Sequence, residues 1–307
     1  MRIMAIADLY PPVPTANQRG NHLRQFSLPN DNKQMNLFNS TRAFYNICLE
    51  DADFRALGRP FGWSVFFHYL GRWYDRRKVA MPTRNVPFSY HGRHLEFEMT
   101  NQYTAALKDI FKDNQYDCAR EFGQSPSRIL DLGGNIGLSS VFFSKAFPEA
   151  KLAVVEPDPR NLTLLRKNLG LNGASAMVVD GAVGHRAGTL TLRYGVNPTC
   201  SSTTLTEWTA IHELVNEIEV PVTTVPKVME QAGWDHIDLL KIDIEGAEEE
   251  LLSRDNQWLA KVEAIIMEVH ANTTIERLNG HLAPFGFILT RFGGGREPVY
   301  FAKKKLS

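Results

Sequence analysis

Cysteine is scarce in this sequence of 307 residues, which contains three, Cys48, Cys118 and Cys200. They lie far apart and are odd in number, so they favour neither a disulfide framework nor a zinc site built from cysteines. A chain that uses cysteine in this way is typical of a reducing compartment, and we expect it to function in the cytoplasm.

The sequence also lacks a surplus of charge and a long apolar run. Lys and Arg number 34, as do Asp and Glu, so there is no electrostatic basis for binding nucleic acid. No segment approaches the about 18 uncharged apolar residues that a membrane span needs. Asp8 and the pair Pro11-Pro12 end the first apolar run too early for a signal peptide. We therefore expect neither nucleic acid nor a membrane as a partner.

A glycine-rich turn near the middle of the chain is the most informative feature that is present. Residues 128–132 predict a short buried strand, and residues 138–146 repeat apolar side chains at helical spacing until Pro148 ends the helix. Glycines between a strand and a helix allow close backbone approach, and the first amide groups of the helix remain available to a ligand. The turn therefore predicts a binding site for a nucleotide-like molecule.

The spacing of this turn indicates which molecule. A dinucleotide fingerprint has the form G-x-G-x-x-G, whereas this sequence reads D-x-G-x-x-x-G from Asp131 to Gly137. An acidic residue before such glycines suits a ligand with a cationic amino-acid group and no pyrophosphate. We predict S-adenosylmethionine, not NAD, as the cofactor; its expected binding residues in the turn are Asp131, Gly133, Gly134, Asn135 and Gly137. The alternative is a glycine turn that binds nothing.

Strand and helix patterns alternate after the turn, which predicts an α/β fold with a doubly wound, mostly parallel sheet. The further strands are expected at residues 152–155, 176–179, 237–242 and 264–269, with a closing antiparallel pair at 287–289 and 299–302. Residues 189–193 suggest a small inserted hairpin, and residues 200–204 a polar loop that serves as a lid. Thr273 and Glu276 form a capping box for a helix.

The beginning of the chain carries no cofactor motif. We divide the chain into an N-terminal extension, residues 1–100, which is a candidate substrate cap, and a cofactor-binding domain, residues 101–307. The extension should be mainly helical and pack on the domain, because no low-complexity linker separates them. It ends in a predicted hairpin at residues 88–99. The aromatic-rich residues 61–74 form either a helix packed on the domain or a wall of a substrate pocket.

Two further strands are followed by carboxylates at the edge where open α/β sheets bind ligands. Glu156 follows the strand at 152–155 and can accept hydrogen bonds from both ribose hydroxyls of a nucleoside. Asp180 follows the strand at 176–179 and can accept one from the adenine amino group. The alternative for each is to cap the following helix, a role for which Asp158 is better placed than Glu156.

A second group of polar side chains is expected at the ends of the next two strands. Lys241, Asp243 and Glu245 alternate along one strand face, and a lysine inside an apolar strand is costly unless a carboxylate pairs with it. Glu268 and His270 share a face on the following strand. If these strands are neighbours, three carboxylates and a histidine meet, which suits proton transfer or a hard cation. The alternative is an internal ion-pair network around Lys241.

The sequence resembles the FkbM family of S-adenosylmethionine-dependent methyltransferases. The resemblance covers about residues 95–289 and is carried by the turn at 129–137, Glu156-Pro157, Gly181-Ala182-Val183 with Gly188, the run DLLKIDIEGAE at 238–248, and Glu268-Val-His270. The part K-x-D-x-E-G-A-E, at residues 241–248, is specific to the family, whereas the glycine turn alone fits any methyltransferase of this fold. The resemblance implies O-methylation of hydroxyl groups on natural products and sugars, on a Rossmann-like methyltransferase sheet. It also implies a cofactor site that includes Gly181, Ala182 and Asp243.

We therefore predict methyl transfer by in-line displacement to a small-molecule acceptor. A neutral hydroxyl needs a base, and His270 is the candidate because an unperturbed imidazole titrates near neutrality. Asp243 and Glu245 would orient the substrate or the imidazole, and no metal is assigned. Mg²⁺ held by Asp243, Glu245 or Glu268 is an alternative mechanism. N-methylation, a cofactor-binding module without turnover and an NAD-dependent oxidoreductase are alternative functions; the acceptor's identity and a homodimer are left open.

Overall fold

A computed structural model describes residues 83–122, 124–194, 201–202, 216–293 and 298–304. All of them fall within one of the two contact units of the chain, Thr41–Ser307. The expectations for residues 61–74 and for the rest of the chain before residue 83 lie outside the described residues. The same holds for Cys48, Cys200 and most of the predicted lid, whereas Cys118 is a buried free thiol.

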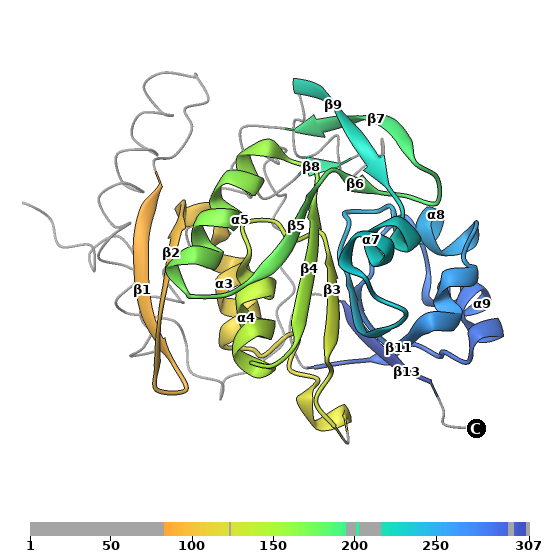
Figure 1. Cartoon of the computed structure of the whole chain (residues 1–307), viewed down its shortest axis with the longest axis horizontal. Coiled ribbons are helices and arrows are strands. Elements are labelled where there is room, and N and C mark those ends of the chain that lie inside the picture. The colour runs from red at the N-terminus through yellow and green to blue at the C-terminus, as the bar shows by residue number, and fades with distance from the viewer. Residues whose placement is uncertain (1–82, 123, 195–200, 203–215, 294–297, 305–307) are drawn as a thin grey trace, which may run out of the picture. The chain divides into compact units, whose positions relative to one another are not determined.

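A seven-stranded sheet lies at the centre of the fold, in the order β12-β13-β11-β10-β3-β4-β5 (Figure 1). Its parallel strands are β3 (Arg128–Leu132), β4 (Lys151–Glu156), β5 (Ala176–Asp180), β10 (Ile237–Ile242) and β11 (Val262–Glu268). β13 (Val299–Lys303) lies antiparallel to β11, and β12 (Thr290–Arg291) lies antiparallel to β13. The predicted α/β sheet with its C-terminal antiparallel hairpin is confirmed. The chain changes direction across the sheet between β3 and β10, where such folds bind ligands.

Helices cover both faces of this sheet (Figure 1). One layer contains α3 (Thr104–Phe111), α4 (Leu138–Ala146) and α5 (Pro159–Leu171), and the other contains α7 (Val225–Ala232), α8 (Glu248–Ser253) and α9 (Ile275–Leu282). Alternation along the strands supplies both cores: Ile129 packs with the first layer, and Leu130 and Leu132 with the second. Short 3₁₀ helices lie at Asn101–Tyr103, Ala119–Glu121, Gln257–Lys261 and Ala283–Phe285.

Helix starts follow the local chemistry of the chain, with one shift. α5 begins after Asp158, whose side chain accepts a hydrogen bond from the N–H of Arg160 at 2.9 Å, as predicted. The predicted capping box at Thr273 is wrong by one residue, because Thr274 caps α9. The hydroxyl of Thr273 instead donates to Glu249 at 2.7 Å.

A separate four-stranded sheet, in the order β6-β9-β7-β8, stands where a small hairpin was expected. Its strands are β6 (Ala182–Val183), β7 (Gly188–Tyr194), β8 (Ser201–Ser202) and β9 (Asn216–Thr223). β9 pairs with β7 across a long stretch of sequence, and most of its side chains are exposed although Ile218, Val220 and Val222 alternate with other residues. Two residues of the predicted polar loop at 200–204 are therefore a short strand.

The C-terminal hairpin also begins later than its apolar pattern predicts. Phe287 and Leu289 are buried at 0% and 4% exposure, but the strand that pairs with β13 is Thr290–Arg291. The N–H of Leu289 donates to the side-chain oxygen of Asn279 at 2.8 Å. An apolar run thus marks burial here without marking a strand.

The predicted hairpin at residues 88–99 is confirmed as β1 (Arg84–Tyr90) and β2 (Arg93–Met99). Two asparagines, Asn168 within α5 and Asn172 directly after it, bind the edge of β2. The side chain of Asn168 accepts from the N–H of Glu98 at 2.7 Å and donates to the carbonyl oxygen of Glu98 at 3.2 Å. Asn172 makes the same pair of bonds to Glu96, at 3.0 and 2.7 Å. These amides act as a neighbouring strand would, and so the hairpin edge is covered by the helix.

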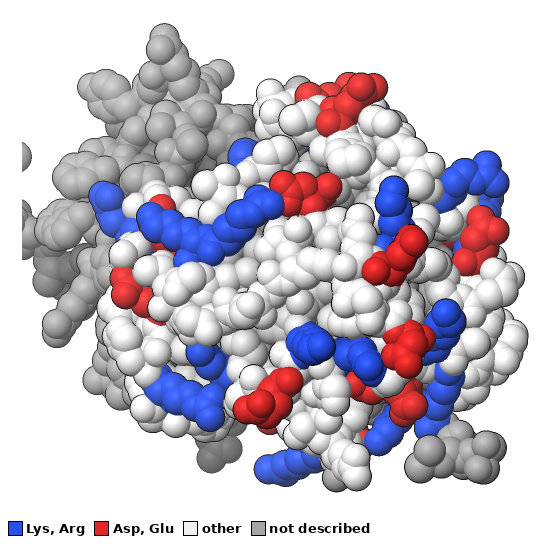
Figure 2. Space-filling view, viewed as in Figure 1, with Lys and Arg blue, Asp and Glu red and all other residues white. Residues whose placement is uncertain are grey.

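Charged side chains of both signs are interspersed over the face shown in Figure 2. Among the described residues, no helix combines the length and the apolar composition of a membrane span.

Asn168→Ala should lower the free energy of unfolding by roughly 2–4 kcal/mol. The side chain is fully buried and also donates to the carbonyl oxygen of Ile136 at 2.8 Å, so its removal leaves several backbone groups without partners. Urea denaturation measures the change. Thr163→Ala, on the exposed face of the same helix, should stay within about 0.5 kcal/mol of the wild type. Equal losses in the two variants would contradict the role given to Asn168.

Candidate active site

Two glycines at the end of β3 let the turn fit between its neighbouring strands. Gly133 has a φ of +82°, and a Cβ there would lie 1.8 Å from the carbonyl oxygen of Asp243. A Cβ on Gly134 would lie 2.1 Å from Cγ2 of Val154. The N–H groups of both glycines donate to the carbonyl oxygen of Val155, at 2.9 and 3.1 Å. Because neither position has room for a side chain, the turn lies directly against β4 and the end of β10.

The buried carboxylate of Glu156 ties this turn to the end of β4. It accepts hydrogen bonds from the N–H of Asn135 at 2.8 Å, the N–H of Asp158 at 2.9 Å and the side-chain amide of Asn161 at 3.3 Å. Burial raises the pKa of Glu156 to about 7, although these hydrogen bonds act in the opposite direction. A ligand hydroxyl that donates to Glu156 would favour its charged form.

A cavity of about 70 Å³, the first cavity, opens beside Glu156. The turn, the ends of β4 and β10, and β6 and β7 of the small sheet form its walls. The structure brings together six of the predicted cofactor residues in this lining: Gly133, Asn135, Glu156, Gly181, Ala182 and Asp243. The cavity is therefore shaped by the residues that sequence reasoning selected for a nucleoside.

The other four predicted cofactor residues, Asp131, Gly134, Gly137 and Asp180, lie outside the first cavity. Gly134 lines the second cavity, described below. Gly137 is the residue before α4, with a φ of +88°, and lines neither cavity. The side chain of Asp180 is 55% exposed and forms an ion pair with Arg166; it also lies outside both linings.

Asp131 lies inside the sheet and not in a cavity. Its carboxylate accepts hydrogen bonds from the hydroxyls of Ser139 and Ser140, each at 2.7 Å, and lies 3.1 Å from Nζ of Lys241. The register of β3 and β10 places Lys241 directly opposite Asp131. Both side chains are 1% exposed, so the charge of Asp131 is balanced within the protein. The ion pair of Asp131 with Lys241 therefore links β3, directly before the turn, to β10.

Lys241 has the carboxylate partners that its position in an apolar strand predicts. Its Nζ also lies 3.4 Å from Oδ2 of Asp243 and donates to the carbonyl oxygen of Gly133 at 2.7 Å. Burial lowers the pKa of Lys241, but Asp131 and Asp243 outweigh burial and raise it to about 12. The hydroxyl of Tyr116 donates to the same Oδ2 at 3.2 Å. The ion-pair network around Lys241 is thus confirmed, and it fixes one oxygen of Asp243.

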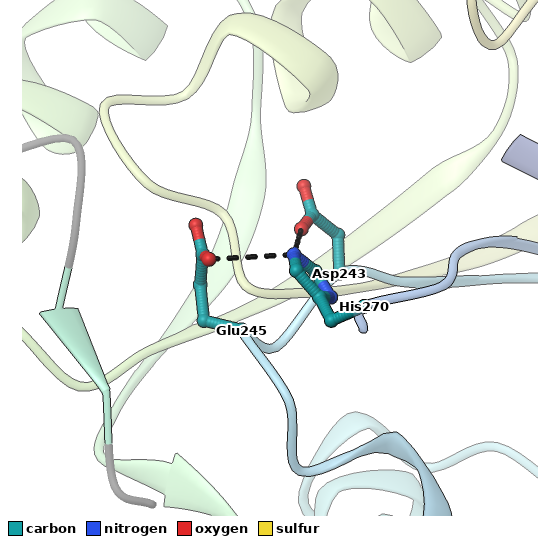
Figure 3. Close-up of side chains that lie close together, drawn as sticks. All are labelled: Asp243, Glu245 and His270. Carbon is teal, nitrogen blue, oxygen red and sulfur yellow. Dashed lines mark ion pairs between the residues drawn. The ribbon is translucent and has the colours of Figure 1, made fainter. Parts of the chain in front are cut away.

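The ends of β10 and β11 bring His270 against carboxylates, two of which appear with it in Figure 3. Nε2 of His270 lies 3.3 Å from Oε2 of Glu245, 3.9 Å from Oε1 of Glu268 and 4.0 Å from Oδ1 of Asp243. The two strands are parallel neighbours, as the prediction required. The expected meeting of Asp243, Glu245, Glu268 and His270 is confirmed.

Sequence reasoning did not select Glu248, a further carboxylate at His270. Glu248 is the first residue of α8 and is fully buried, and its Oε1 lies 2.8 Å from Nδ1 of His270. A signal was present, because an acidic residue at the start of a helix after a glycine turn is well placed to bind backbone N–H groups. Nothing local connects that position with His270, which lies 22 residues away.

These carboxylates set the charge of His270. Burial lowers the pKa of the imidazole, but hydrogen bonds to Glu245 and Glu248 outweigh burial and raise it to about 12. The premise of an unperturbed imidazole is therefore wrong: His270 is an imidazolium at neutral pH. Burial raises the pKa of Glu245 as well. Ligand atoms of Asp243, Glu245 and His270 all lie within 4.8 Å of one another, close enough to bind a divalent cation.

A second cavity, of about 200 Å³, lies beside the first. α3, Tyr116 and Glu268 contribute to its walls, whereas Gly133, Asn135, Asp243 and Glu245 line both cavities. His270 belongs to neither lining, and its side chain is 15% exposed. A ligand that extended from one cavity into the other would pass Asp243 and Glu245, and His270 lies next to these two carboxylates.

Comparisons with known proteins connect this geometry with methyl transfer. The model of the methyltransferase FkbM domain matches residues 131–292, a range that contains every predicted site residue. Methyltransferase sdnD of Sordaria araneosa is 30% identical over 255 residues, which are 72% of this chain and 97% of sdnD.

Two further relatives are more distant. The 2-O-methyltransferase NoeI of Sinorhizobium fredii is 26% identical over 155 residues, covering 46% of this chain and 62% of NoeI. The 31-O-demethyl-FK506 methyltransferase FkbM of Streptomyces tacrolimicus is 25% identical over 169 residues, covering 46% of this chain and 65% of that protein.

Glu156→Gln should flatten the dependence of stability on pH. The pKa of Glu156 in the folded protein is about 7, above the 4.5 of an ordinary glutamate, so the folded state binds the proton more tightly. The contribution of Glu156 to the free energy of unfolding is therefore lost as the pH rises from 4.5 to 7. Because a shift of one pKa unit corresponds to about 1.36 kcal/mol, the loss is about 3 kcal/mol. Urea denaturation across this range measures the slope. The exposed control Glu149→Gln should keep the wild-type slope; an unchanged slope in Glu156→Gln would refute the assignment.

Proposed function

Since the chain belongs to the FkbM-domain family of methyltransferases, we propose that it methylates a hydroxyl oxygen of a small natural product or sugar moiety. The chain is an S-adenosylmethionine-dependent methyltransferase. Two relatives support oxygen as the methylated atom, because their names describe a 2-O-methyltransferase and a 31-O-demethyl-FK506 methyltransferase. The observation that carries the proposal is the meeting of two cavities at Asp243 and Glu245, where a hydroxyl can lose its proton.

The donor's nucleoside would lie in the first cavity, against the residues predicted to bind it. The carboxylate of Glu156 would accept hydrogen bonds from the ribose hydroxyls, and Gly181 and Ala182 would contact the base. The methionine part would lie over Gly133 and Asn135, which line both cavities. Asp180 would reach the adenine amino group only by leaving its ion pair with Arg166.

The acceptor would lie in the second cavity with its hydroxyl at the shared wall. When bound, S-adenosylmethionine would supply the methyl group and take back the electrons of the broken carbon–sulfur bond, leaving as S-adenosylhomocysteine. The residues of this chain would hold the hydroxyl oxygen against the methyl carbon and accept the proton that the oxygen loses. Positioning against the methyl carbon and a nearby proton acceptor are the two requirements of this step.

The proton would pass to the pair formed by Glu245 and His270. Glu245 lines both cavities, whereas His270 lies next to it at 3.3 Å and is already an imidazolium. We therefore assign proton acceptance to the Glu245 carboxylate, with the imidazolium holding that carboxylate in place. Asp243, fixed through Oδ2 by Lys241 and Tyr116, would orient the acceptor with its other oxygen. The role of His270 thus changes from sole base to partner of the base.

The acceptor atom can be tested with donor that carries a labelled methyl group. The purified chain is incubated with a panel of hydroxylated natural products and glycosides, and products are identified by mass spectrometry and NMR. We expect the label in methyl ethers. Label found only on nitrogen would overturn the proposal, and binding of S-adenosylhomocysteine without turnover on any acceptor would favour a non-catalytic module.

Turnover should persist in excess EDTA; its loss and recovery with Mg²⁺ would instead assign Asp243, Glu245 and His270 to a metal.

His270→Ala should lower turnover by roughly 10²-fold or more, because the Glu245 carboxylate loses its cationic partner. Affinity for S-adenosylhomocysteine, measured by calorimetry, should change little, since His270 lines neither cavity. His94→Ala, at an exposed histidine of β2, is the matched control and should keep wild-type turnover. Near-normal turnover in His270→Ala would remove His270 from the catalytic unit.

A further inference from the structure

Glu248 is fully buried, belongs to neither cavity lining and has no part in the mechanism described so far. We infer that Glu248 is a positioning residue that holds the imidazole of His270 by Nδ1, so that Nε2 points at the proton-accepting carboxylate of Glu245. The expected effect of Glu248 on the turnover rate rests on the proposed function. Its structural part, the link between Glu248 and His270, stands independently of any acceptor.

The two nitrogens of His270 have different surroundings. Nδ1 lies 2.8 Å from Oε1 of Glu248, which is 0% exposed, whereas Nε2 has its nearest carboxylate oxygen at 3.3 Å, on Glu245. The other carboxylates that face the ring, Glu268 on β11 and Asp243 after β10, are 3.9 and 4.0 Å from Nε2. Of these four carboxylates, Glu248 alone faces Nδ1. A carboxylate bonded to one imidazole nitrogen fixes the ring orientation and leaves the other nitrogen for chemistry.

Glu248 is itself fixed by the backbone that carries Glu245. The same Oε1 accepts hydrogen bonds from the N–H of Ile244 at 3.3 Å and of Gly246 at 3.1 Å. Between these two residues, Glu245 has a φ of +54°, a left-handed conformation that a non-glycine residue rarely adopts. One carboxylate oxygen therefore holds both the turn that presents Glu245 and the ring that faces it. The two members of the proton-accepting pair are thus fixed relative to each other.

The arrangement around Glu248 allows its charge to be removed with little change of shape. All three hydrogen bonds use Oε1, and Oε2 has no hydrogen-bond partner among the described residues. In Glu248→Gln, the amide oxygen can occupy the place of Oε1 and keep all three bonds. Glu248→Ala removes the bonds as well as the charge. Comparison of the two variants separates electrostatic stabilisation from geometry.

Proton NMR of protein with ¹⁵N-labelled histidine provides a readout that does not need an acceptor. His270 is identified by the signals that disappear in His270→Ala. In the wild type we expect a slowly exchanging Nδ1–H at low field and no titration of the ring from pH 6 to 9. In Glu248→Gln the Nδ1–H should remain, but the ring should titrate within this range because one of its facing carboxylates is gone. In Glu248→Ala the slowly exchanging Nδ1–H should be absent.

Turnover completes the test. Glu248→Gln should lower kcat at pH 7 by about tenfold, and Glu248→Ala by more, with affinity for S-adenosylhomocysteine within twofold of the wild type. Glu250→Gln, on the same helix at a side chain that is 56% exposed, is the matched control and should behave as the wild type. Wild-type NMR signals of His270 in both Glu248 variants would overturn the inference. Altered signals with an unchanged kcat would support the contact between Glu248 and His270 but refute its effect on catalysis. If the wild type and all variants fail to methylate any acceptor, the proposed function is refuted, and the NMR result still decides whether Glu248 holds His270.

Discussion

The ion pair between Lys241 and Asp131 is the contact on which the rest of the site depends. Each charge alone would be costly in this position, because both side chains are 1% exposed and share strand faces with Ile129 and Leu239 of the first apolar core. Together they are stable because Ser139 and Ser140 donate to the carboxylate and the ammonium binds the carbonyl oxygen of Gly133. The pair therefore holds the cofactor turn and the end of β10 at a fixed separation.

The second consequence of this pair concerns the carboxylates above it. Lys241 also approaches Asp243, whose Oδ2 accepts from Tyr116, so one acidic group at the cavities is oriented from within the core. Burial is the main reason why the pKa of Tyr116 lies well above its ordinary value, and the negative charge of Asp243 raises it further. The phenol therefore keeps its proton and remains a hydrogen-bond donor. Asp243, which lines both cavities, is thus oriented by two groups that also contribute to the wall of the second cavity.

The sheet and much of the site could be predicted from the sequence because their signals are local. The apolar strand before Gly133, Asp158 with Pro159 at the start of α5, and Glu156 at the end of β4 each lie within a few residues of what they determine. Alternation along β10 likewise placed Lys241 and its carboxylates on one face. Such patterns depend on backbone geometry that is the same in every strand or helix.

The remaining features depend on burial or on residues far apart in sequence. The pairing of β9 with β7, and the contact of Glu248 with His270, join segments that lie more than 20 residues apart, and no local pattern specifies which segments meet. The pKa of His270 depends on the carboxylates that surround the ring, and the ordinary pKa of a histidine side chain does not contain that information. Asp131 was predicted to bind the cofactor, whereas the structure buries its side chain away from both cavities, opposite Lys241 in the register of β3 and β10.

The lining that the two cavities have in common has a consequence for the order of events. Because Gly133, Asn135, Asp243 and Glu245 belong to both, an occupant of either cavity becomes part of the wall of the other. In the proposed reaction, the first molecule to arrive would therefore complete the surface that receives the second, and any effect of one on the affinity of the other would be reciprocal. Departure of the spent nucleoside would, in turn, remove the surface against which the methylated product rests.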